Sequence, residues 1–227
     1  VCPVRLRLLL SSLKIDISVS DSKDIKPQAD FNVPLMSLPY VLKLDKIIDP
    51  SPYIWADFGL VEKWGSILGN SHKPRIGLNW QGNPYYEADH QRSFALENLR
   101  PLIVDERYEF VSLQQGYGIE QVIEFKENII HFSDSVDHDS GFIDTAAIIV
   151  NLDLIITSDT ALAHLAGALG VRVWVLLPST PDWRWLLDGS NCQWYKTMRL
   201  FRQKVVGEWT HVVDQVRDAL NKEFSHS

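Results

Sequence analysis

The sequence predicts an α/β fold built on a parallel sheet whose two faces are covered by helices. Beyond about residue 75, short apolar runs alternate with segments in which apolar residues have helical spacing. Strands that are apolar on both faces are typical of parallel sheets buried between helices. The 227 residues, 45% of them hydrophobic, suffice for one large domain or two small ones.

The first 70 residues have weak periodicity. We expect a helix over 4–13, a strand over 15–19 and a short helix within 33–44, because prolines 27, 34, 39, 50 and 52 exclude long elements. A helix is predicted over 58–68 and ends at Gly69-Asn70-Ser71. We place a domain boundary at 69–74, which divides the chain into residues 1–70 and 71–227.

The rest of the chain alternates between strands and helices. Strands are predicted over 75–80, 108–113, 129–132, 154–157 and 171–177. Helices are predicted over 94–104, with Ser93 as its cap, and over 119–125, 142–151, 160–169 and 209–224. Such sheets bind ligands outside the carboxyl ends of their strands, so loops that follow strands are the places to search for a site.

Charge and cysteine content exclude several classes of function. The net charge of −7 and pI near 5.5 do not suit a nucleic-acid-binding surface. No apolar run has the length of a membrane span. Cys2 and Cys192 are far apart, which favours a reducing cytoplasm over a disulfide framework and gives no support to a metal site. The chain starts with Val1 in mid-pattern, and we expect it to be a fragment.

The most informative segment joins the strand at 154–157 to the helix at 160–169. Ser158, Asp159 and Thr160 favour the start of a helix. The free N–H groups and the positive dipole end of that helix, with Ala161 in its first turn, predict a phosphate site. Thr160 and His164 are four residues apart and share one helix face. Helix capping by Asp159 and a buried hydrogen bond of His164 are the structural alternatives.

A second candidate follows the strand at 75–80. Asn79-Trp80-Gln81-Gly82-Asn83 and Gln91-Arg92-Ser93 provide a glycine that admits close backbone approach and an arginine suited to a diphosphate. The alternative is a polar turn with a surface arginine. Gln114, at the end of the strand at 108–113, could read a ribose or a base edge, or simply end the strand.

Three further motifs favour structural interpretations. The tryptophans of Trp183-Arg184-Trp185 favour packing around the arginine over stacking on a base or sugar. Asp137-His138-Asp139 has no further spaced ligands, so a solvated loop is favoured over a metal site. Arg199, Arg202 and Lys204 are interpreted as an exposed basic edge, with phosphate contact as the alternative.

Several of these motifs together resemble the C-terminal region of bacterial tetratricopeptide-repeat glycosyltransferases. These proteins are similar to the heptosyltransferase-like glycosyltransferase family 9, which uses ADP-heptose, and more distantly to O-linked N-acetylglucosamine transferases. The resemblance lies in residues 77–83, 110–114, 153–170 and 181–203, within a similarity that runs from about Phe31 to Trp209.

The resemblance implies a GT-B fold, in which two Rossmann-like domains face one another across a cleft. Residues 71–227 would be the C-terminal domain that binds the nucleotide-sugar donor, and residues 1–70 the tail of an N-terminal acceptor-side domain. No metal and no cofactor besides the donor would be needed. The implied acceptor is a glycan, a lipopolysaccharide or a protein, and tetratricopeptide repeats would lie upstream.

The resemblance also assigns residues. Asp159, Thr160, Ala161 and His164 would contact the phosphates or sugar of the donor, and the loop of Gln81, Gly82 and Asn83 would lie over the diphosphate. Arg92 stands where heptosyltransferases have a lysine. We therefore expect Arg92, Asp159 and His164 to stabilise donor and leaving group, with donor contacts from Asn79, Trp80, Gln81, Gly82, Asn83, Gln114, Ser158, Thr160 and Ala161. The catalytic base is unassigned.

The resulting expectation is the donor-binding region of an inverting, metal-independent glycosyltransferase. Two alternatives stay open. One is a catalytically silent GT-B module that binds a nucleotide-sugar or a protein. The other is a nucleotide-sugar epimerase or hydrolase, since a fold by itself does not determine a reaction.

Overall fold

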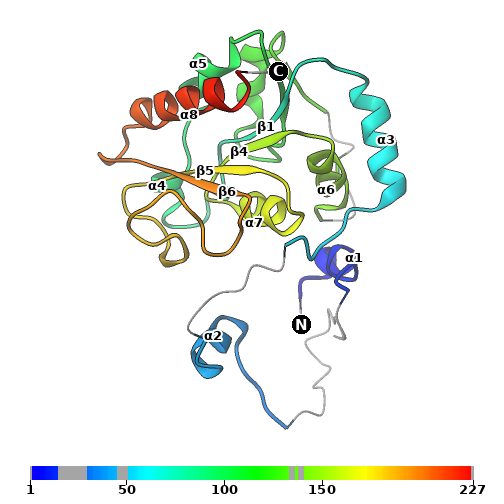
Figure 1. Cartoon of the computed structure of the whole chain (residues 1–227), viewed down its shortest axis with the longest axis vertical. Coiled ribbons are helices and arrows are strands. Elements are labelled where there is room, and N and C mark those ends of the chain that lie inside the picture. Colours follow the sequence, from blue (N-terminus) through cyan, green and yellow to red (C-terminus); the bar gives the residue numbers. More distant parts are fainter. Residues whose placement is uncertain (1, 15–29, 45–50, 133–135, 138–140, 226–227) are drawn as a thin grey trace.

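The computed structural model describes residues 2–14, 30–44, 51–132, 136–137 and 141–225. Within them a six-stranded sheet runs in the order β3-β2-β1-β4-β5-β6, and every neighbouring pair of strands is parallel. The strands are β1 (Arg75–Asn79), β2 (Glu109–Ser112), β3 (Ile129–Ile130), β4 (Leu154–Ser158), β5 (Val173–Leu177) and β6 (Met198–Arg202). The predicted α/β class with a parallel sheet is confirmed (Figure 1).

Helices cover both faces of this sheet (Figure 1). One hydrophobic cluster contains α6 and α7 with part of α3, and the other contains α8 and α5. Successive residues of β4 divide between the clusters, Ile155 into the first and Leu154 and Ile156 into the second, as the two-residue period of a strand requires. The helices are α1 (Arg7–Leu10), α2 (Leu38–Val41), α3 (Phe58–Leu68), α4 (Asp89–Arg92), α5 (Arg100–Ile103), α6 (Ile143–Val150), α7 (Ala161–Ala168) and α8 (Thr210–Glu223), and the 3-10 helices are η1 (Val4–Leu6), η2 (Leu35–Ser37), η3 (Leu96–Leu99), η4 (Ile119–Phe125) and η5 (Trp183–Trp185).

Most of the elements predicted within the described residues are present, and two helices differ from their predicted extent. The helix expected over 94–104 divides into η3 and the single turn α5, with Pro101 in the first turn of α5, because proline is tolerated at a helix start but not in its interior. The helix expected over 4–13 consists only of η1 and α1. The strand expected over 15–19 lies outside the described residues.

β6 was not predicted, and it corrects the interpretation of Arg202 as part of an exposed basic edge. Arg199 is exposed, but Arg202 is the last residue of β6 and is partly buried. Its guanidinium donates to four backbone carbonyls, those of Trp185, Leu186, Asp188 and Gly189. Arg202 therefore holds the loop that contains η5 against the edge of the sheet.

α3 lies beside α6 and contributes to the same core as the sheet. Trp64 is 2% exposed, and its indole N–H donates to Asp144 Oδ1 at 2.7 Å. Gly65 lies so close to Asn151 that an added Cβ would approach its Oδ1 to 2.9 Å. The residues just before the expected boundary at 69–74 are thus packed against the main sheet domain.

Candidate functional site

The two predicted segments meet at the carboxyl ends of the two central strands. Asn79, the last residue of β1, is paired in register with Thr157 of β4. The strand order reverses between β1 and β4, and ligands of open α/β sheets bind at that reversal. The loop after β1 and the start of α7 therefore share one rim of the sheet.

A buried network of amides and hydroxyls joins the two segments beneath the rim. Asn79 Oδ1 accepts hydrogen bonds from the hydroxyls of Thr157 (3.1 Å) and Thr160 (2.9 Å). Thr160 is the N-cap of α7 by position, but its side chain makes no cap hydrogen bond. Its hydroxyl holds Asn79 instead, which leaves amides in the first turn of α7 to be met by solvent or a ligand.

Gln114 lies under the loop rather than on its surface. Its Oε1 accepts from Asn79 Nδ2 (2.8 Å), Trp80 N (3.1 Å) and Gln81 N (3.0 Å), and its Nε2 donates to the carbonyls of Gln81 (2.9 Å) and Tyr117 (2.7 Å). These bonds occupy both ends of the amide. Gln114 therefore sets the shape of the loop, and its expected contact with a ribose or a base stays a prediction.

Two more predicted donor contacts are buried below the rim. Trp80 is fully buried in the core, and its indole N–H donates to the carbonyl of Gly118 at 3.3 Å. Ser158 is also fully buried, at the last position of β4. The strand periodicity that placed these side chains at the end of a strand does not distinguish side chains turned into the core from side chains turned toward the rim.

Arg92 bridges the loop after β1 and the start of α7. Its Nη1 donates to the carbonyl of Asp159 at 2.7 Å, and its Nε donates to Asp89 Oδ1 at 3.0 Å. Its guanidinium carbon lies 4.7 Å from the centre of the Tyr86 ring. Gly82 lies against it, since an added Cβ there would approach Arg92 Nη2 to 2.7 Å. The side chain of Arg92 remains 22% exposed and forms an ion pair with the buried carboxylate of Asp89, so the rim carries a partly exposed guanidinium whose charge is balanced by Asp89.

Asp89 and Ser93 complete this arrangement. No role was predicted for Asp89, and Ser93, predicted to cap the helix over 94–104, instead follows α4, because the N-cap of η3 is Ala95. Ser93 Oγ accepts from Gly82 N at 2.9 Å and donates to Asp89 Oδ2 at 2.9 Å. Asp89 is only 4% exposed and binds both Arg92 and Ser93. The four-residue spacing of Asp89 and Ser93 is a weak signal, which becomes informative only once α4 is known.

His164 lies on α7 behind this rim, half-buried between aromatic rings. It stacks on Trp185 with ring centroids 5.1 Å apart, and its Nδ1 lies 3.2 Å from the hydroxyl of Tyr195. Burial lowers the pKa of His164 to about 4, helped by Arg184 and opposed by Asp182. The imidazole is therefore neutral at pH 7.

The carboxyl group of Asp159 is buried beside Trp185, the residue on which His164 stacks. It is 7% exposed, and burial raises the pKa of this carboxyl, against opposing effects of Trp185, Arg92 and Arg184. Its backbone carbonyl, rather than its side chain, binds Arg92.

The two tryptophans of Trp183-Arg184-Trp185 have different surroundings, since Trp185 is 1% exposed whereas Trp183 is 59% exposed. Arg184 pairs with Asp182 at 2.8 Å.

Asp137, predicted in a solvated loop, is instead engaged by α6. Its carboxylate accepts hydrogen bonds from the backbone of Asp144 and from the backbone and hydroxyl of Thr145. His138 and Asp139 lie outside the described residues. Within the described ranges, no three His, Cys, Asp or Glu side chains are grouped to hold a metal ion.

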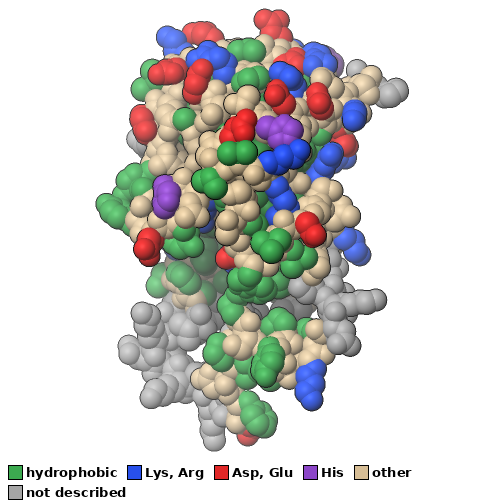
Figure 2. Space-filling model, turned by 90° about the vertical axis from the view of Figure 1, so that its left-hand side faces the viewer, with side chains coloured by type: hydrophobic (Ala, Val, Ile, Leu, Met, Phe, Trp, Pro, Cys, Tyr) green, Lys and Arg blue, Asp and Glu red, His purple; other side chains and the backbone are tan. Residues whose placement is uncertain are grey.

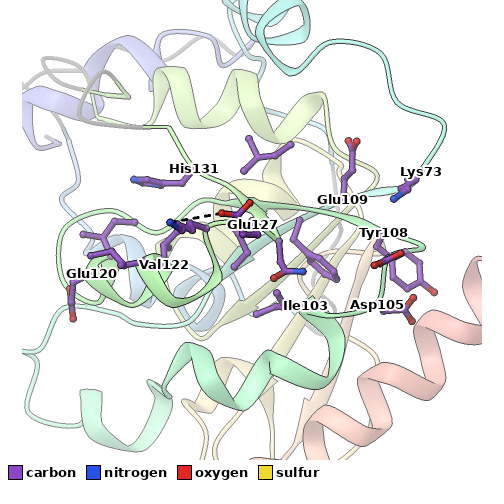
Figure 3. Close-up of a pocket in the computed structure, with 17 residues that line it drawn as sticks. Lys73, Ile103, Asp105, Tyr108, Glu109, Glu120, Val122, Glu127 and His131 are labelled. Carbon is purple, nitrogen blue, oxygen red and sulfur yellow. Dashed lines mark ion pairs between the residues drawn. The ribbon is translucent and has the colours of Figure 1, made fainter.

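Two hollows flank the rim. One of about 440 Å³ is lined by Gln81, Asp89 and Ser93. The other, of about 190 Å³, contains Ala161, His164 and Tyr195 in its lining but is otherwise mostly apolar, with Leu6, Leu9, Ile54 and Phe142 among its lining residues. A third, of about 840 Å³, lies along β2 and β3, where Tyr108, Glu109 and His131 face it (Figure 3). None of the predicted site residues lines this third hollow. Its volume alone does not connect it with the chemistry of the rim.

The surface charge agrees with the low pI. On the face in Figure 2, the described acidic and basic side chains are interspersed and do not form a continuous basic band. No helix in the described ranges is both long enough and apolar enough to cross a membrane.

The chain was compared with family models, with curated proteins and with solved structures, and the solved structures share its fold. No family model matches the chain. FlbA of Caulobacter vibrioides is 28% identical over 158 residues, which are 68% of this chain and 26% of FlbA. The solved structure of E. coli ADP-heptose lps heptosyltransferase II matches 77% of this chain and 56% of its own, with TM-score 0.52 and 18% identity. A glycosyl transferase family 9 protein from Veillonella parvula matches 77% of this chain and 54% of its own, with TM-score 0.55 and 14% identity.

The two solved structures show that this chain shares its parallel α/β fold with part of those glycosyltransferases. The chain spans about a quarter of FlbA and just over half of the two solved structures. The link to tetratricopeptide repeats stays a prediction.

Proposed function

We propose that this chain is the donor-binding region of a glycosyltransferase that takes a sugar from a nucleoside-diphosphate sugar. The fold supports the class of ligand. The observation that carries the proposal is the bond from Arg92 to the carbonyl of Asp159, immediately before α7. It places a partly exposed guanidinium beside the first turn of a helix, and both features attract a phosphate.

Arg92 and α7 would act mainly on the leaving group. As the bond between the sugar and the diphosphate breaks, negative charge grows on the phosphate oxygens. A fixed guanidinium and a helix N-terminus stabilise that charge without reorganising. Nε and Nη1 of Arg92 are held by protein atoms, and Nη2 lies against Gly82. This tethering prepositions the cation, and we propose that no metal ion is required.

His164 and Asp159 would have supporting roles in the same step. A neutral His164 supplies an N–H donor to the phosphates or the sugar, and Asp159 holds Arg92 through its carbonyl. Attack by an acceptor hydroxyl from the face opposite the diphosphate inverts the anomeric centre. We assign no base among the residues of the rim, and we propose a glycan, lipopolysaccharide or protein acceptor in the cytoplasm.

The direct test is calorimetric titration with nucleoside diphosphates and their sugars in buffer containing EDTA. We expect at least one nucleoside diphosphate to bind, and Arg92→Ala to weaken it about tenfold or more, because a hydrogen bond to a charged group is lost. Arg100→Ala is the matched control, since Arg100 is half-exposed and pairs with Glu97 away from the rim. Failure of every nucleoside diphosphate to bind would refute the proposal, and equal effects of the two variants would remove Arg92 from the site.

Product analysis then distinguishes the reaction classes. With donor present, a transferase releases nucleoside diphosphate in an acceptor-dependent manner. Conversion of the donor sugar without acceptor would indicate an epimerase or a hydrolase instead.

A further inference from the structure

Tyr195 is held against His164 by contacts on two sides. It is 7% exposed and lies in the segment that precedes β6, with its hydroxyl 3.2 Å from His164 Nδ1 and 3.3 Å from the hydroxyl of Tyr53. Its ring lies flat against Gly167 of α7, where an added Cβ would approach the Tyr195 Cγ to 2.5 Å. The place of this phenol is therefore determined by packing as well as by hydrogen bonding.

The two ring nitrogens of His164 have different surroundings. Nδ1 faces Tyr195, whereas Nε2 has no hydrogen-bond partner among the residues that the structure describes. The stacking on Trp185 restricts rotation of the imidazole, and the ring lines the hollow that Ala161 borders. A neutral imidazole carries its one proton on either nitrogen, and the partner of the other nitrogen decides which.

The chemistry of the pair favours one direction for the bond. A phenol O–H is a stronger acid than a neutral imidazole N–H, and an imidazole nitrogen is a better acceptor than a phenol oxygen. Burial raises the pKa of Tyr195, so the phenol keeps its proton. The favoured arrangement is a chain in which Tyr53 donates to Tyr195 and Tyr195 donates to Nδ1.

We propose that Tyr195 is a positioning residue, which places the proton of His164 on Nε2 and so directs an N–H donor toward the diphosphate of the bound donor. This assignment deepens the proposed function and rests on it. An anion accepts hydrogen bonds, so the opposite tautomer would present a lone pair to the phosphates and repel them.

The tautomer can be measured on the unliganded chain by nitrogen NMR, without reference to activity. We expect His164, identified by its absence from the spectrum of His164→Gln, to show an unprotonated Nδ1 and a protonated Nε2. Protonation at Nδ1 would overturn the proposal. This result decides the assignment even if no nucleoside diphosphate binds, in which case it is the proposed function that fails.

The functional test is a double-mutant cycle on nucleoside-diphosphate affinity. Tyr195→Phe should weaken binding about three- to tenfold, the effect of one ordinary hydrogen bond, and should have no further effect in a His164→Gln background. Tyr108→Phe is the matched control, because Tyr108 is also 7% exposed but belongs to the other core cluster. Equal losses from Tyr195→Phe in both backgrounds would show that Tyr195 acts independently of His164 and would overturn the proposal.

Discussion

Gly82 has no room for a side chain, because Asp89 and Arg92 occupy the space where a Cβ would lie. An added methyl group would approach Asp89 Oδ1 to 2.5 Å and Arg92 Nη2 to 2.7 Å. The guanidinium is the more flexible of the two groups, so it would move. The glycine thus protects the position of the arginine as well as the shape of the loop.

We predict that Gly82→Ala weakens nucleoside-diphosphate binding about tenfold and lowers the free energy of unfolding by about 1–3 kcal/mol, as overpacking does. Titration calorimetry and urea denaturation measure the two effects. Gly59→Ala is the control, because Gly59 is an exposed residue of α3 with only the tip of Asp57 nearby. Unchanged affinity in Gly82→Ala would mean that the position of Arg92 does not matter for the ligand.

The burial of His164 has a consequence for stability at acid pH. The pKa falls from 6.5 to about 4 on folding, so the unfolded chain binds the proton more tightly. Above pH 6.5 His164 is neutral in both states, and its contribution to the free energy of unfolding is fully present. As the pH falls from 6.5 toward 4, protonation of the unfolded chain removes that contribution.

We predict that the stability of the wild-type chain falls by about 2–3 kcal/mol more than that of His164→Gln between pH 7 and pH 4. Urea denaturation at several pH values measures the difference. The raised pKa values of the Asp159 and Asp137 carboxyls act in the opposite direction, but they are common to both proteins and cancel. Parallel pH profiles for the two proteins would contradict the burial of a neutral imidazole.

At the scale of elements, the loop after β1 owes its shape to the neighbouring strand. Gln114 follows β2 and accepts from two consecutive amides of that loop, those of Trp80 and Gln81. A single side chain therefore replaces the backbone pairing that ends when the two strands separate.

We predict that Gln114→Ala lowers the free energy of unfolding by about 2–4 kcal/mol, because several buried hydrogen-bonding groups lose their partner. Hydrogen exchange should show faster exchange at the amides of Trp80 and Gln81 specifically. Gln115→Ala, at the exposed neighbouring position, should leave both amides protected. Unchanged protection in Gln114→Ala would show that the loop is held by other contacts.

The elements that could be predicted from the sequence are those with a strong local pattern. The central strands and the helices at 58–68, 143–150, 161–168 and 210–223 have apolar runs or clear periodicity. β6 was missed because Arg199 and Arg202 interrupt its apolar residues. The split of the helix at 94–104 follows from Pro101, which fits the first turn of α5 but not the interior of one continuous helix.

The candidate site could be predicted only where its residues follow strands. Arg92 and Thr160 were found from loops that follow β1 and β4, and the structure brings them to one rim. Tyr195 and Trp185 contact His164 across more than 20 residues of chain. No local pattern indicates such a contact, so the surroundings of the imidazole had to come from the structure.

At the scale of the whole molecule, one sheet separates two cores that share its strands. α3 belongs to the first core through Trp64 and Leu68, although it precedes the first strand of the sheet. Loss of either core would expose one face of every central strand. The two cores should therefore unfold together.

We predict a single unfolding transition in urea, with coincident changes in far-UV circular dichroism and tryptophan fluorescence. The amides of α3 should exchange with a free energy close to that of global unfolding. A separate, earlier loss of α3 would place it in a different cooperative unit. Trp64→Phe, which removes the bond to Asp144, should lower the midpoint of the one transition without splitting it.

The segment just before α3 is held both by the backbone at the end of α7 and by the aromatic residues around His164. The amides of Tyr53 and Ile54 donate to the carbonyl of Ala168, Pro52 lies against Gly170, and the Tyr53 hydroxyl reaches Tyr195. The hydroxyls of Tyr53 and Tyr195 therefore connect this segment to the imidazole of His164 through side chains alone. The surroundings of His164 are therefore set in part by a segment that precedes the whole sheet in the sequence.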